Sequence, residues 1–138
     1  MITFVPLTVY TAIVDNIEPV SFISIESGDD FILSFFVTRP DDPSDGRSLI
    51  LSRDKKWEYL LYDGERGVRV YDEAYPEDVG REIDYLESID LGKTIVEVKS
   101  TRSKYQLDMS RVDETELRAA KKILKKMNYD NRFKLTVV

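Results

Sequence analysis

Short apolar stretches separated by turn-forming residues occupy the first half of the chain, a pattern that is typical of strands. Residues 1–14 are rich in β-branched and aromatic side chains, although a proline limits this stretch to an edge strand or a bulge. Segments 19–26 and 31–38 predict two further strands. Additional strands are predicted at 48–52, 57–62 and 68–71, so we expect a meander of antiparallel strands.

Two connecting segments are interpreted from turn chemistry and from apolar spacing. Residues 39–47 combine two prolines with a glycine and other turn-forming residues, which predicts a mobile surface loop. The window 76–92 opens on a proline followed by two acids and places Val79, Ile83 and Leu86 on one helical stripe, which favours a short helix. The sequence YLESI within this window, read alone, is equally typical of a strand.

The strongest local pattern predicts a helix from about Asp113 to Asn128. Asp113 and Glu116 form an acidic analogue of the capping box, which specifies where the helix begins. The apolar residues that follow recur on one helical face, and four lysines lie in the last turns, where cations suit the helix dipole. One face of this helix therefore belongs to the core.

These elements together predict the fold class. A hairpin of strands at 94–100 and 104–110 precedes the helix, and alternation over 132–138 predicts a last strand after it. We expect a single α+β domain over residues 1–138. Its architecture is a mostly antiparallel, twisted sheet of six to eight strands with the C-terminal helix (about 113–128) packed on one face.

The composition restricts the chemistry that is available to this protein. The 138 residues include no His and no Cys, which excludes histidine triads, thiol nucleophiles and metal sites built on imidazole or thiolate ligands. Phosphate-cradling glycine motifs and nucleophile elbows are also missing from the sequence. We therefore expect a protein that is not an enzyme and that holds no cofactor and no metal.

The net charge of −6 conceals two halves of opposite sign. Residues 1–92 carry 20 Asp+Glu and 8 Lys+Arg, net −12, whereas residues 93–138 carry 6 and 12, net +6. The most acidic window, 72–90, holds eight carboxylates and a single cation, Arg81. Unless the basic C-terminal third neutralises it, this window attracts a basic partner.

Aromatic side chains coincide with these acids, because five of the eight Tyr and the only Trp lie between Trp57 and Asp90. Tyrosine and tryptophan dominate binding hot spots, and negative charge around them accelerates encounter with a cationic surface. Trp57, Tyr59 and Leu61 alternate and are interpreted as core residues of a strand. The predicted partner-binding residues are Tyr71, Asp72, Glu73, Tyr75, Glu77, Asp78, Glu82, Asp84 and Tyr85.

The expected partner is therefore a basic protein. A nucleic acid would meet the basic C-terminal third, but the net −12 of the larger part opposes a polyanion, so we expect no nucleic-acid binding. No apolar run approaches membrane-spanning length and no leader pattern opens the chain, so we expect a cytoplasmic protein without a membrane partner. A homodimer that forms through an exposed edge of the sheet is also compatible with the sequence.

In general character, a small, acidic, thiol-free α+β chain with an acid–aromatic segment resembles the immunity proteins that bacteria make against their own basic toxins. The resemblance implies an inhibitor that occupies the surface a basic nuclease uses for phosphates. Two alternatives stay open from the sequence: an adaptor or self-assembling structural module, and a hydrolase that uses carboxylates or magnesium.

Overall fold

The structure is a computed structural model that describes residues 17–39, 41–74 and 83–138. The strand predicted at 1–14 lies outside these residues, and so does the first part of the helix predicted at 76–92. Four of the predicted partner-binding residues also lie outside them: Tyr75, Glu77, Asp78 and Glu82.

Eight strands form one sheet in the order β4-β3-β2-β1-β7-β6-β5-β8. They are β1 (Ile17–Ser27), β2 (Phe31–Arg39), β3 (Asp42–Arg53), β4 (Arg69–Asp72), β5 (Leu86–Leu91), β6 (Ile95–Ser100), β7 (Lys104–Asp108) and β8 (Lys134–Val137). Neighbours are antiparallel except at β1–β7 and β5–β8, which are parallel. The predicted α+β class, the mostly antiparallel sheet and the final strand after the helix are confirmed.

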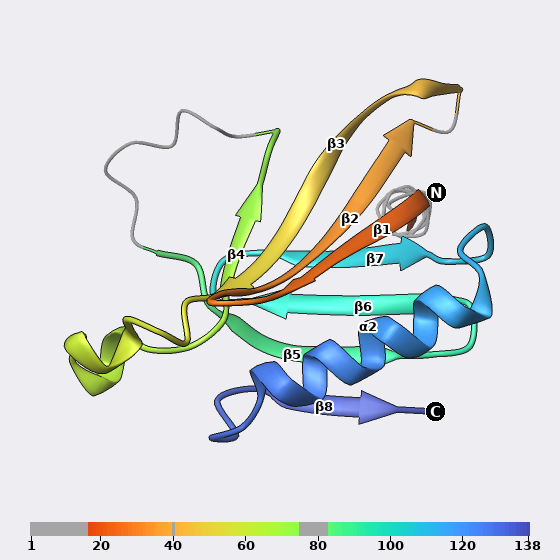
Figure 1. The fold of residues 1–138 in the computed structure, drawn as a ribbon. Coiled ribbons are helices and arrows are strands. Elements are labelled where there is room, and N and C mark those ends of the chain that lie inside the picture. Colours follow the sequence, from red (N-terminus) through yellow and green to blue (C-terminus); the bar gives the residue numbers. More distant parts are fainter. Residues whose placement is uncertain (1–16, 40, 75–82) are drawn as a thin grey trace, which may run out of the picture.

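The helix α2 (Glu114–Met127) packs on one face of the sheet, against β1 and β2. Strands β1 to β4 fan away from the β5–β8 half in Figure 1, which shows how strongly the sheet twists. The residues that α2 buries against the sheet are Ala120, Ile123, Leu124 and Met127. On the opposite sheet face, Phe22 and Phe36 stack with their ring centroids 5.0 Å apart.

The start of α2 follows the predicted capping chemistry. The Asp113 side chain accepts a hydrogen bond from the Glu116 backbone N–H at 2.8 Å, so it satisfies one of the amides that have no partner within the helix. From this helix the chain continues into β8, which pairs with β5 rather than with β7. Strands β7 and β8 therefore run parallel within one sheet, separated by β6 and β5.

The helix predicted over 76–92 is wrong for the part that the structure describes, because residues 86–91 form β5 between β6 and β8. Of the predicted stripe, Val79 lies outside the described residues, and Ile83 is 46% exposed and precedes β5, so no helical face forms; β5 itself has a β-bulge between Leu86 and Ser88. The bulge inserts one residue, so Leu86 and Ile89, three positions apart, are both buried. The alternative interpretation of YLESI as a strand therefore agrees with the structure for residues 86–89.

The mobile loop predicted at 39–47 is also wrong, because β3 begins at Asp42 and already pairs with β2 through Val37–Arg47 and Thr38–Gly46. A register shift at the end of β2 accommodates the turn-forming residues. At Gly46 a Cβ atom would collide with the Val37 carbonyl oxygen, so glycine permits the close approach of the two strands.

Candidate functional site

Residues 54–67, which connect β3 to β4, carry the most exposed aromatic side chains of the described residues. We call this segment the aromatic excursion. It contains two short 3-10 helices, η1 (Glu58–Leu60) and η2 (Asp63–Glu65), and stands off the end of the sheet in Figure 1 as the yellow-green coil. Four of its large side chains are between 52% and 84% exposed: Trp57, Tyr59, Leu60 and Tyr62.

The predicted strand at 57–62 is therefore wrong, and so is the interpretation of Trp57 and Tyr59 as core residues. The Asp54 side chain accepts a hydrogen bond from the Trp57 backbone N–H at 3.1 Å, and the Asp54 carbonyl accepts another from Glu58 N–H at 3.1 Å. These local bonds turn the chain out of the sheet directly after β3. The alternating pattern thus belongs to a turn whose apolar side chains face solvent.

A buried arginine anchors the excursion to the rest of the fold. Arg53 is the last residue of β3, and its side chain is 0% exposed. Its guanidinium donates to both oxygens of Glu58, the shortest contact being 2.6 Å, and to the Asp130 carboxylate at 2.7 and 2.8 Å. A further bond of 2.7 Å reaches the Met127 carbonyl oxygen. All five N–H donors of the guanidinium are therefore satisfied.

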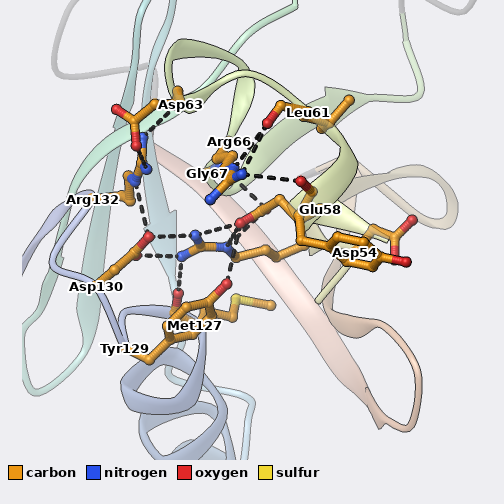
Figure 2. Close-up of polar contacts among 12 residues, drawn as sticks. Asp54, Glu58, Leu61, Asp63, Arg66, Gly67, Met127, Tyr129, Asp130 and Arg132 are labelled. Carbon is orange, nitrogen blue, oxygen red and sulfur yellow. Dashed lines mark hydrogen bonds and ion pairs between the residues drawn. The ribbon is translucent and has the colours of Figure 1, made fainter. Parts of the chain in front are cut away.

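The carboxylate of Glu58, which lies within η1, is the second centre of this network. Figure 2 shows that Glu58 and Gly67 approach each other inside the excursion, and Gly67 N–H donates to Glu58 at 3.3 Å. The Tyr129 hydroxyl donates to the same carboxylate at 3.1 Å, while its ring lies 4.2 Å from the Arg53 guanidinium carbon. Gly67 has φ +138°, which only glycine adopts without strain, so the excursion returns to the sheet through a glycine.

Both carboxylates in the Arg53 network remain ionised over the physiological pH range. Hydrogen bonds from Arg53, and after them from Arg132, lower the pKa of Asp130 to about 2 against the opposing effect of burial. Burial alone raises the pKa of Glu58, but the hydrogen bonds from Arg53 and Gly67 outweigh it and hold this pKa below its usual range. The network is thus a buried cation held between two anions.

Further contacts fix the outer part of the excursion. Arg132 bonds to the Asp63 carboxylate at 2.6 Å, and the two side chains lie close together in Figure 2. The Arg66 guanidinium donates to the Leu61 carbonyl at 3.0 Å, and the Tyr85 hydroxyl donates to the Glu65 carbonyl at 2.9 Å. The backbone is therefore held from several sides, while the aromatic side chains of the excursion point into solvent.

Carboxylates gather beside the first aromatic residue of the excursion. The turn between β1 and β2 carries Asp29 and Asp30, and Asp54 faces it from the end of β3. Desolvation of its carboxylate and, after it, the charge of Asp54 raise the pKa of Asp30. Lys56 bridges this acidic turn to the aromatic surface, because its Nζ lies 3.5 Å from Asp29 and 5.2 Å from the Trp57 ring centroid.

The predicted partner-binding acid Asp72 faces the interior. Its side chain is 7% exposed, lies 2.7 Å from the Arg47 guanidinium and accepts a hydrogen bond from the Tyr105 hydroxyl at 3.2 Å. Arg47 also contacts Glu18 at 2.6 Å, so this cluster joins β3 to β1, β4 and β7. Burial raises the pKa of Tyr105 to about 12. The geometry assigns these groups to the fold.

The other described members of the predicted site make contacts of different kinds, although Asp84 and Tyr85 pair with Val70 and Arg69 of β4 beside Tyr71. The Asp84 carboxylate accepts hydrogen bonds from Ser100, Thr101 and Arg102 and closes the β6–β7 turn. Tyr71 is 45% exposed on the sheet face opposite α2. The Glu73 carboxylate accepts a hydrogen bond from the Ser48 N–H, and the Tyr85 hydroxyl donates to the backbone of the excursion. Their part in partner binding stays a prediction.

Sequence reasoning missed the Arg53 network because its members are distant in the chain, with Asp130 lying 77 positions from Arg53. One signal was available. Leu49, Leu51 and Arg53 alternate along β3, so the arginine occupies the core-facing position of a strand. A charged residue at such a position requires buried partners of opposite charge.

Within the described residues, no group of three or more Asp or Glu side chains is placed to hold a metal ion. None of the described helices is long and apolar enough to cross a membrane. No protein-family model, no curated protein and no solved structure matches this chain.

Proposed function

We propose that this chain is a non-enzymatic domain that binds a basic protein through the aromatic excursion. The observation that supports this is the exposure of Trp57, Tyr59, Leu60 and Tyr62 on a backbone that the buried Arg53–Glu58 contact and the surface Arg132–Asp63 contact hold in place. Side chains of this kind bury large areas with little loss of rotamer freedom. A backbone that is already ordered also loses little entropy on binding.

The charge around the excursion supports a basic partner. Asp54 lies beside Trp57, Asp29 lies nearby in contact with Lys56, and the Asp63 side chain, which contacts Arg132, is 87% exposed. The whole chain carries a net charge of −6. Carboxylates around an aromatic centre complement a cationic surface and accelerate its encounter. In the sharper form of the proposal, the partner is a basic toxin and this protein is its immunity-type inhibitor.

The test begins with a photo-crosslinking amino acid at position 62, compared with the same amino acid at position 71, in cells that produce the full chain. We expect position 62 to form an adduct with a basic protein that position 71 does not form. The identified protein is then purified, and its Kd for this chain is measured by calorimetry and its association rate by stopped flow.

Matched variants then separate the excursion from other exposed aromatic residues. Trp57→Ala or Tyr62→Ala should weaken binding by roughly 2 kcal/mol, about 30-fold in Kd, as hot-spot residues do. Tyr71→Ala, a similar truncation on the sheet face opposite α2, should change Kd by less than about threefold. Equal effects of all three variants, or an association rate that ignores ionic strength, would contradict the proposal.

The stacked pair on the open sheet face favours a second candidate, a self-assembling module. Phe22 is 51% exposed although it stacks on Phe36, and Tyr71 extends the apolar surface on the same side of the sheet. Sedimentation of the parent and of Phe22→Ser across a range of concentrations decides between the two candidates. A dimer that Phe22→Ser abolishes would favour self-assembly, and a monomer at all concentrations would exclude it.

A further inference from the structure

A cavity of about 420 Å³ lies between the N-terminal half of α2 and the sheet, away from the aromatic excursion. Its apolar walls come from five elements of the fold. They include Phe35 of β2, Val96 of β6, Met109 after β7, Leu117 of α2 and Val137 of β8. Cavities of this size and apolar character are typical of sites for small organic ligands, whereas the groove that a partner helix needs is longer.

The rim of this cavity is positively charged. Lys93, from the turn between β5 and β6, lines the cavity together with Arg118 and Lys121 of α2. Glu114 is the single acidic side chain among the lining residues, which also include the last residue of the chain, Val138. Within residues 17–39, 41–74 and 83–138, no ion pair joins any of these three cations to a carboxylate. An apolar interior with a cationic rim suits a ligand that combines an apolar body with an anionic head.

We propose that the cavity binds an unbranched fatty carboxylate. The acyl chain lies between helix and sheet, against Leu117 and Met109, and the carboxylate meets Lys93, Arg118 and Lys121 at the rim. The apolar walls favour the chain because its burial removes apolar surface from water. The three cations favour a negative head over a neutral or a positive one, which sets the class of ligand.

This site is independent of the aromatic excursion. The Arg53 network contacts α2 at its C-terminal residue Met127, whereas Leu117 and Arg118, which line the cavity, belong to the first half of the helix. Loss of fatty-acid binding would therefore leave the protein-binding proposal intact, and the reverse also holds.

The first test uses dodecanoate and the full chain labelled with ¹³C at its methionine methyl groups. Both Met109 (2% exposed) and Met127 (0% exposed) are buried, but only Met109 lines the cavity, so the two methyl signals form a matched pair in one sample. We expect titration with dodecanoate to shift the Met109 signal and to leave the Met127 signal in place. Unchanged signals, or equal shifts at both methyl groups, would overturn the proposal.

Calorimetry then tests the two parts of the ligand separately. The Kd should fall by roughly fourfold for each methylene added from octanoate to dodecanoate, as burial of a methylene predicts. Dodecanol should bind more weakly than dodecanoate, and dodecyltrimethylammonium more weakly still. An affinity that ignores chain length or head-group charge would contradict the proposal.

A charge-reversal pair completes the design. Arg118→Glu should weaken dodecanoate roughly tenfold and leave dodecanol unaffected, since each exposed charge contact contributes modestly. Lys104→Glu makes the same change of charge on the sheet face opposite α2 and should alter neither ligand. Equal weakening of dodecanoate by both variants would mean that the general charge of the protein, rather than the rim, attracts the anion.

Discussion

The Arg53 network should dominate the stability of the end of the sheet that carries the aromatic excursion. Arg53→Met replaces the guanidinium by an unbranched apolar side chain and leaves Glu58 and Asp130 without their shared cation. Removing one member of a buried ion pair typically costs 3–5 kcal/mol, because the remaining charge is left without compensation. We expect a loss of about 4 kcal/mol, a large part of the roughly 5–15 kcal/mol that stabilises a typical domain.

The assay is urea denaturation followed by far-UV circular dichroism and by the fluorescence of Trp57, the only tryptophan of the chain. Circular dichroism reports the whole fold, whereas Trp57 reports the excursion. We expect the two transitions to coincide in the parent protein. In Arg53→Met both midpoints should fall, and the fluorescence transition should precede the other because the excursion has lost its anchor.

Arg132→Met is the matched control. Arg132 also contacts Asp130, but its second partner, Asp63, is 87% exposed, so this pair resembles a surface salt bridge. Such pairs contribute roughly 0–1 kcal/mol. If Arg53→Met proved no more destabilising than Arg132→Met, the interpretation of the network as the anchor of the excursion would be refuted. Arg53→Met combined with Glu58→Leu should recover part of the loss, since the second change removes the uncompensated charge.

Two further predictions concern the helix cap and acid stability. Asp113→Ala should lower the free energy of unfolding by about 1 kcal/mol in the same urea assay, because the Glu116 N–H loses its hydrogen-bond partner. An unchanged free energy of unfolding would show that the cap contributes nothing to stability. The pKa of Asp130 is lowered to about 2, so its contribution is complete above its ordinary pKa near 4 and is lost as the pH falls towards 2. Urea midpoints measured between those pH values should therefore fall in the parent and fall less in Asp130→Asn.

The sequence correctly predicted the elements in which the arrangement of apolar residues along the chain matches the residues that are buried. Strand β2 is a nearly continuous apolar run, and helix α2 has apolar residues at intervals of three to four and buries the face that this spacing defines. The capping aspartate adds a signal that does not depend on the rest of the fold. Local physics therefore accounts for the fold class, for helix α2 on one face of the sheet and for the final strand.

The wrong predictions occur where partners distant in the sequence decide the structure. Strand β5 has helix-like spacing, and its pairing with β6 on one side and β8 on the other determines that it is a strand. The alternation of residues 57–62 resembles a strand, yet β4 pairs with β3 beyond this segment and leaves it outside the sheet. Tertiary pairing overrides local preference in both cases.

The candidate site was still harder to predict, because the number of charged residues in a segment does not show in which direction their side chains point. The window 72–90 is the most acidic of the chain, yet Asp72 is directed inward to Arg47, and Asp84 is held by the residues of a turn. The exposed aromatic residues, by contrast, lie in a segment whose pattern indicated the core. Among the described residues, acids and an exposed aromatic ring lie together beside Trp57, where Lys56 contacts Asp29.

The buried charges and the exposed rings are two parts of one arrangement. A buried ion pair is often no more stable than apolar residues of the same volume, so stability alone does not account for Arg53 at a core position. The geometry of the arginine side chain accounts for its position better. Glu58 of the excursion and Asp130 after α2 both bind one guanidinium, whose planar shape fixes the directions of its N–H donors. This sets the position of the excursion relative to the helix. A surface segment held in this way can present Trp57 and Tyr62 in one arrangement, as selective recognition of a partner requires.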